Sequence, residues 1–260
     1  MASNYWADRM AASQSKLTNK NIKQVEKQLK KYYGSAMERV IKDFETTYNK
    51  LLLTIEDGKE PTPADLYKLD TYWQMQGQLR QELNKLGDKQ ISAMSKIFEI
   101  HFFDIYYSIA IPGLEAFTTI SKEAAAQLIA AIWVADGKNF SQRIWDNTNR
   151  LVDTLNEGLL HCVITGKKTS ELKKVLQNDF NVSYSRADAV VRTEMSHIQN
   201  TAAQKRYEDY GIKEFMVWAD EDERRCEVCG ALHEKKYLIG SETPIPAHPR
   251  CRCSIVPVVE

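Results

Sequence analysis

Residues 19–55 read NKNIKQVEKQLKKYYGSAMERVIKDFETTYNKLLLTI, and this stretch sets the class of the fold. Apolar and aromatic residues recur in it at steps of three and four, and charged residues fill the positions between them. This spacing is typical of an amphipathic helix with one face to bury. We therefore predict one long helix over residues 3–57.

The same helical pattern continues to about residue 210. A new helix is predicted to begin at Thr62, because Pro63 and then Asp65 follow it as in a capping box. The last helix is predicted to end at Gly211. The helices expected between these points are 63–111 with a break near Gly87, 121–134, 141–166, 170–182 with Ser170 as its cap, and one that starts at Ser183 or Ser185.

The pattern changes after Gly211. Residues 212–220 and 253–259 are rich in Val, Ile, Phe and Trp and are predicted to be short strands. The predicted fold is mainly α, with an elongated helical N-terminal region and a small C-terminal α+β module. We expect a helical region at 1–115 and a second region at 116–260, with the module at about 212–260.

Composition excludes several classes of protein. The 260 residues include 35 basic and 35 acidic side chains, so the chain has no global basic field that would bind DNA non-specifically. The first twenty residues lack the apolar core of a secretory signal. Charged residues, Pro and Gly interrupt the longest apolar stretches, which favours buried helices over membrane spans.

Four of the five cysteines lie in the last 35 residues. Cys226 and Cys229 form a Cys-x-x-Cys pair, and His248 and Cys251 repeat the two-residue gap. Four nitrogen and sulfur ligands at this spacing predict a structural, tetrahedral Zn²⁺ site. The spacing alone does not choose between Cys251 and Cys253 as the fourth ligand. His233 is a further, weaker candidate.

Such a module needs a stabilising cross-link, because about fifty residues with few large apolar side chains bury little surface. A structural metal supplies that stability. A catalytic zinc is disfavoured, since four protein ligands leave no open position for water. Reduced thiols without metal and a redox-active cysteine pair are the alternatives.

Two further groups of residues stand out. Arg192, Thr193 and Glu194 lie within a predicted helix, and a structural ion pair is a better interpretation of them than catalysis. Four arginines flank the candidate ligands and are predicted either to contact nucleic-acid phosphates or to pair with the acidic residues 220–223. These arginines are Arg224, Arg225, Arg250 and Arg252.

Most of the chain resembles phage Mu F-type minor head proteins, and the C-terminal residues match the C-terminal domain of that family. The resemblance rests on an Arg-Thr-Glu helix, a Trp before an Asp-rich turn, Cys-x-x-Cys, and a Pro-x-His-Pro-x-Cys-Arg-Cys ending. It is strongest over about residues 120–257. The matching positions are Arg192, Thr193, Glu194, Trp218, Asp220, Asp222, Arg225, Cys226, Cys229, His248, Pro249, Cys251, Arg252 and Cys253.

The resemblance implies a minor capsid, or head morphogenesis, protein of a tailed phage or prophage. Its expected partners are the portal protein, the major capsid or scaffold protein, and phage DNA, with no membrane. Its expected location is the capsid interior, after synthesis in the bacterial cytoplasm, and it is expected not to be an enzyme. Some members carry an extra C-terminal toxin or ADP-ribosyltransferase domain, and because seven residues follow Cys253 we expect no such domain here. The alternative is a zinc-dependent nucleic-acid-binding protein or nuclease.

Overall fold

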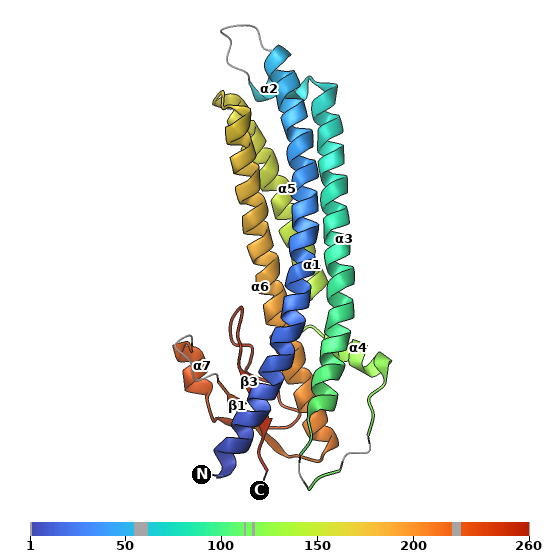
Figure 1. The fold of residues 1–260 in the computed structure, drawn as a ribbon, viewed down its shortest axis with the longest axis vertical. Helices are drawn as coiled ribbons and strands as arrows, with labels where there is room; N and C mark the ends of the chain where they lie inside the picture. Colours follow the sequence, from blue (N-terminus) through green and yellow to red (C-terminus); the bar gives the residue numbers. More distant parts are fainter. Residues whose placement is uncertain (1, 55–61, 112, 116–117, 220–224, 260) are drawn as a thin grey trace. The chain divides into compact units, whose positions relative to one another are not determined.

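The computed structural model describes residues 2–54, 62–111, 113–115, 118–219 and 225–259. This part of the chain is mostly helical, with a small antiparallel sheet near the C-terminus, which confirms the predicted class (Figure 1). None of the described helices combines the length and the apolar character that crossing a lipid bilayer requires. The elements are α1 (Ala2–Thr54), α2 (Pro63–Tyr67), α3 (Asp70–Ser108), α4 (Lys122–Ala130), α5 (Phe140–Ile164), α6 (Thr169–Asp209), β1 (Glu214–Trp218), α7 (Glu227–Leu232), β2 (Lys236–Leu238) and β3 (Ser254–Pro257).

Local signals placed several helix ends correctly. The backbone N–H of Thr62 donates to the Asp65 carboxylate at 3.0 Å, as the predicted capping box requires. Ser121 caps α4, because its hydroxyl oxygen accepts from the N–H of Ala124 at 3.1 Å. Gly211 follows α6 with φ of 74°, a left-handed conformation that glycine adopts without a steric penalty.

Several predicted helix boundaries are wrong. The stretch predicted as one helix over 63–111 forms α2 and α3, α4 ends at Ala130, and Ser170 lies inside α6 instead of capping it. Two further errors have a tertiary cause. Helix α3 runs unbroken through Gly87, where an added Cβ would lie 2.8 Å from the Trp145 ring, so this glycine serves close helix packing. Helix α6 runs unbroken through Ser183, whose buried hydroxyl lies 3.1 Å from the Tyr33 hydroxyl. In both cases the residue that was predicted to break or cap a helix instead contacts a residue that is distant in sequence.

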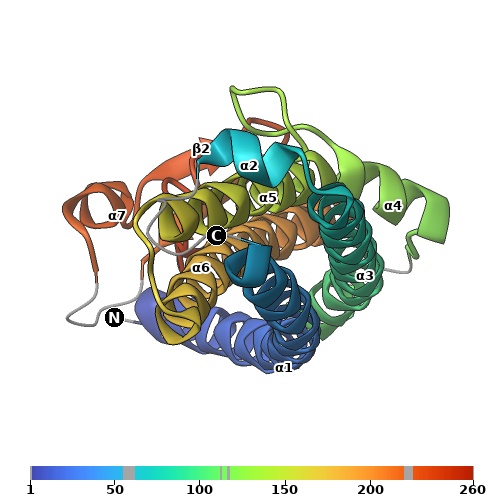
Figure 2. The same ribbon diagram turned by 90° about the horizontal axis from the view of Figure 1, so that it is seen from above.

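The chain divides into two compact units, each assembled from separate segments. One unit comprises Lys27–Ser92 and Ser141–Asp188. Its segments of α1, α3, α5 and α6 run side by side as a bundle (Figures 1 and 2). In its core the Asn147 side-chain nitrogen donates to the Tyr33 hydroxyl at 3.1 Å and to the Ser183 carbonyl oxygen at 2.9 Å. One amide therefore joins α1, α5 and α6.

The other unit comprises Met1–Glu26, Ala93–Phe140 and Ala189–Glu260, and a buried polar cluster joins its helices. His101 of α3 is fully buried, and its Nε2 lies 3.1 Å from the carbonyl oxygen of Met195 in α6. Because a carbonyl only accepts, Nε2 carries the proton, and Nδ1 accepts from Asn21 of α1 at 3.3 Å. Burial lowers the pKa of His101 to about 4, so the ring is neutral at pH 7.

The three-stranded sheet belongs to the same unit as His101. Its strand order is β2-β1-β3, and both neighbours of β1 pair with it in the antiparallel direction. Strand β3 is an edge strand, yet side chains of α6 satisfy its outer backbone groups. The Ile255 carbonyl accepts from the Tyr207 hydroxyl at 3.0 Å, and the Ile255 N–H donates to the Asn200 side-chain oxygen at 3.0 Å. These bonds attach the C-terminal strand directly to α6.

Candidate metal centre

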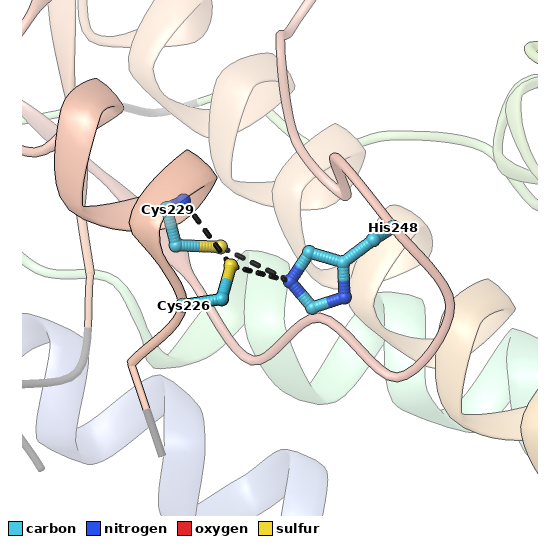
Figure 3. A group of neighbouring side chains, drawn as sticks. All are labelled: Cys226, Cys229 and His248. Carbon is cyan, nitrogen blue, oxygen red and sulfur yellow. Dashed lines mark hydrogen bonds between the residues drawn. The ribbon is translucent and has the colours of Figure 1, made fainter. Parts of the chain in front are cut away.

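The Cys-x-x-Cys pair lies at the start of the short helix α7. Cys226 is its N-cap residue, and the Cys226 Sγ accepts from the backbone N–H of Cys229 at 3.4 Å. A sulfur thus takes the capping role that an Asp or Ser oxygen usually has. This local turn brings both thiols to the same side of the chain, as Figure 3 shows.

His248 faces both thiols. Its Nε2 lies 3.4 Å from the Cys226 Sγ and 3.2 Å from the Cys229 Sγ (Figure 3). The other ring nitrogen, Nδ1, lies 2.9 Å from the Pro249 carbonyl oxygen and must donate to it. In the neutral ring this fixes the tautomer in which Nε2 presents its lone pair to the sulfurs, as a metal ligand requires.

Cys251 and Cys253 complete the cluster. The Cys229 Sγ lies 3.8 Å from the Cys251 Sγ. Two groups of three ligand atoms result, each with all atoms within 4.8 Å of one another, and Cys229 belongs to both. The groups are Cys226, Cys229 and His248, and Cys229, Cys251 and Cys253. This cluster could hold a metal ion.

Contacts within the cluster favour a thiolate at Cys251. A hydrogen bond from the Cys253 thiol lowers the pKa of Cys251 to about 5. Backbone hydrogen bonds also lower this pKa, whereas burial raises it. The bond between the two thiols, with burial, raises the pKa of Cys253. Burial raises the pKa of Cys229 to about 12, whereas the backbone N–H of Cys229 lowers the pKa of Cys226. A thiolate is the form that binds metals.

The three residues Arg192, Thr193 and Glu194 do not form one site, because successive residues of a helix point in different directions. Arg192 forms an ion pair with Glu26 of α1. Buried Glu194 accepts a hydrogen bond from the Trp133 ring nitrogen at 3.1 Å. Thr193 contacts the segment beside the metal cluster, because its hydroxyl accepts from the backbone N–H of Arg250 at 3.0 Å.

The remaining sequence candidates lie around the cluster or away from it. Trp218 ends β1, is buried, and donates from its ring nitrogen to Asp8 of α1 at 3.1 Å. His233 packs on Trp218 and accepts from the N–H of Ala219, and it belongs to neither ligand group of the described residues. Three arginines of the C-terminal module are exposed, namely Arg225, Arg250 and Arg252. Asp220, Asp222 and Arg224 lie outside the described residues.

Sequence reasoning missed two residues that support the cluster, Gln199 and Asn200. Both are buried in α6, where Gln199 donates to the Ser254 hydroxyl at 2.7 Å and Asn200 donates to the Cys253 carbonyl at 3.2 Å. A signal was present, because polar residues here occupy the otherwise apolar face of a predicted helix.

These observations define a mostly helical protein with a compact Cys/His cluster that could bind a metal ion. Residues 153–256 match the family described as phage Mu protein F like protein, so this segment is a domain of that family. The matched segment begins in α5, ends in β3 and includes every residue of the Cys/His cluster.

The chain is also similar to the NAD(+)--arginine ADP-ribosyltransferase EFV of Enterococcus faecalis, with 26% identity over 144 residues. The similarity covers 48% of this chain and 29% of that protein. No solved structure matches the chain.

Proposed function

We propose that the chain is a minor capsid, or head morphogenesis, protein of a tailed phage or prophage. It binds the portal or another procapsid component inside the capsid and acts in head assembly, DNA packaging or DNA delivery. The observation that carries this proposal is the family match at residues 153–256, which spans α5 to β3 and the entire Cys/His module.

Its metal is Zn²⁺, held by Cys226, Cys229, His248 and Cys251. Tetrahedral zinc, with bonds of about 2.3 Å to sulfur and about 2.0 Å to nitrogen, places two sulfurs about 3.8 Å apart and a sulfur and a nitrogen about 3.5 Å apart. The Sγ–Sγ distance of 3.8 Å and the Sγ–Nε2 distances of 3.2 and 3.4 Å in the cluster fit these values. These three distances support zinc. Cys251 shares neither 4.8 Å group with Cys226 and His248, so closing all four ligands around one ion requires a small movement of Cys251 toward them.

Cys251 is preferred to Cys253 as the fourth ligand for an electrostatic reason. The bond to Pro249 raises the pKa of His248, and the charge of Cys251 acts in the same direction. Cys253 instead donates its thiol proton toward Cys251. With four protein ligands the ion has no open position for a substrate, so its role is structural.

A structural zinc would join α7 to the segment that contains His248 and Cys251. Strands β1 and β3 are otherwise held by pairing and by α6, whereas α7 is short and contributes one buried residue, Cys229. The ion would therefore add its stability where packing is weakest.

The relative from Enterococcus faecalis is named as an ADP-ribosyltransferase, but the similarity covers only 29% of its length. We propose no transferase activity for this chain, because the similarity leaves more than two thirds of that protein unmatched. Incubation with NAD⁺ and an arginine-like acceptor tests this assignment. ADP-ribosyl transfer by the chain alone would overturn it.

A nucleic-acid-binding role is the second candidate, and the exposure of Arg225, Arg250 and Arg252 beside the cluster favours it. Guanidinium groups bind phosphates well. Phage DNA is therefore a proposed partner in addition to capsid proteins. A zinc nuclease receives less support, because nuclease chemistry needs an open coordination position at the metal.

Purified particles provide the direct test of the head-protein role. Mass spectrometry of virions and procapsids from the phage or prophage that encodes the chain should detect it in a few copies per particle. Particles assembled without portal should lose it if the portal is its binding partner. Its absence from all particles would refute a virion role, and its retention in particles without portal would point to the major capsid or scaffold protein.

A further inference from the structure

The turn between His248 and Cys251 has a backbone conformation that its sequence does not favour. The Cys251 N–H donates to the His248 carbonyl at 3.2 Å, which closes a four-residue turn. Pro249 holds its second position and Arg250 its third, with φ of 63°. A positive φ at the third position is characteristic of type II turns, which prefer glycine there.

Arginine in this conformation costs free energy, because its Cβ approaches the backbone. The turn determines how His248 and Cys251 are placed relative to each other, since they are its first and last residues. Something outside the turn must therefore stabilise it if both ligands are to be in place before a metal binds.

Thr193 of α6 meets this requirement. Its hydroxyl donates to the Ala189 carbonyl one helical turn earlier at 2.6 Å, so its proton is already used. The hydroxyl oxygen is then oriented to accept from the N–H of Arg250 at 3.0 Å. This N–H belongs to the residue with the unfavourable φ.

A second contact from the same helix holds the chain two residues past Cys251. Asn200, seven residues after Thr193 and on the same side of the helix, donates to the Cys253 carbonyl at 3.2 Å and accepts from the Ile255 N–H at 3.0 Å. Residues 250–255 are thus fixed to α6 at both ends. No side chain of α6 is itself a ligand in either group.

From this arrangement we propose that Thr193 is the positioning residue of the metal centre. It holds Arg250 in its left-handed conformation and so presets His248 and Cys251 for the ion. This inference rests on the proposed metal centre and adds that helix α6 determines its affinity. Hydrogen bonds outside the ligand sphere are expected to act on metal affinity in this way.

The test compares full-length Thr193→Val, Thr193→Ser and wild-type protein in zinc competition with a chelating indicator. Valine keeps the shape of threonine but loses the hydroxyl, so we expect the affinity to fall about 10- to 100-fold. Serine keeps the hydroxyl and should bind nearly as tightly as wild type. Thr46→Val is a matched control, because Thr46 makes the same hydrogen bond to the carbonyl four residues earlier, in α1.

A second variant tests the cause. Glycine adopts a positive φ without the steric penalty of arginine, so Arg250→Gly should restore most of the affinity that Thr193→Val loses. Hydrogen exchange of the Arg250 amide gives an independent measurement, and it should be faster in Thr193→Val than in Thr193→Ser. Far-UV circular dichroism confirms that each variant keeps the helices.

Three outcomes would overturn the positioning role: wild-type affinity in Thr193→Val, equal losses in Thr193→Val and Thr193→Ser, or no recovery with Arg250→Gly. Failure of the metal centre itself is distinguishable, because wild-type protein and all variants would then bind no zinc. Even if no variant binds zinc, hydrogen exchange still tests the contact between Thr193 and Arg250. An unchanged exchange rate of the Arg250 amide in Thr193→Val would refute that contact.

Discussion

Trp133 stacks on His197, with ring centroids 4.3 Å apart and ring planes inclined by only 10°. The same tryptophan donates its ring N–H to Glu194, so two residues of one helical stretch hold it. This contact buries the imidazole, and burial lowers the pKa of His197 to about 4. His101, on α3, has the same property for the same reason.

The unfolding free energy should therefore depend on pH in a defined window. A buried histidine with a pKa of about 4 binds its proton less readily than the unfolded chain, whose histidines titrate near 6.5. Stability is complete above about pH 6.5 and decreases as the pH falls toward 4. Each histidine should remove about 2 kcal/mol between pH 7 and pH 5.

Urea denaturation at pH 7 and pH 5 measures this loss. The variant His197→Gln lacks one titrating ring, so its loss between the two pH values should be smaller than that of wild type by about 2 kcal/mol. An identical pH dependence in the two proteins would contradict the assigned cause.

Two glycines of α3 should respond oppositely to alanine. At Gly87 a Cβ would lie 2.8 Å from the Trp145 ring, so Gly87→Ala should destabilise the protein by about 1–3 kcal/mol. At Gly77 nothing lies within 4 Å, and Gly77→Ala should stabilise the helix by about 0.5–1 kcal/mol. Urea midpoints of both variants check the prediction, and a gain in both would mean that Gly87 is not a packing contact.

Protein purified without a histidine tag should contain about one zinc per chain by elemental analysis. Cys226→Ser and Cys251→Ser should lose the metal, whereas Cys253→Ser should retain it as the matched control. Folded protein without metal would refute the zinc site. Loss of zinc in Cys253→Ser with retention in Cys251→Ser would exchange the roles of the two thiols.

Loss of the metal should release one part of the module and spare the rest. In Cys226→Ser we expect α7 and the turn at His248 to lose protection from hydrogen exchange. Strand β3 should keep its protection, because Asn200 and Tyr207 bind its backbone independently of the metal. The helical far-UV signal should remain nearly intact, and its collapse would show that the metal supports the whole fold.

If the exposed arginines bind DNA, the affinity should fall steeply with salt. Fluorescence anisotropy with a DNA duplex should give a linear plot of log affinity against log salt concentration. The double variant Arg225→Ala and Arg252→Ala should reduce the magnitude of its slope by about 2. A double alanine variant of Lys173 and Lys174, both exposed on α6, removes the same charge elsewhere. Equal slopes for the two double variants, or no binding by wild type, would exclude these arginines as DNA contacts.

Much of the local structure was predictable because its causes are local. The capping box at Thr62 and the stop at Gly211 depend on residues within a few positions. The sulfur-capped turn of Cys226 and Cys229 is equally local. The short strand β2 was not predicted, because three residues with an exposed face give no clear alternation and its partner in β1 lies about twenty residues away.

The sequence by itself determined that this chain is helical, that its last fifty residues differ, and that thiols and one histidine lie at metal-binding spacing. Only the tertiary structure decided that Gly87 and Ser183 continue their helices and that Thr193 meets Arg250, 57 residues away. Periodicity and spacing encode what a residue does along its own element. They carry no information on which distant backbone group a buried hydroxyl or amide will satisfy, and that pairing is fixed when the helices pack and exclude water.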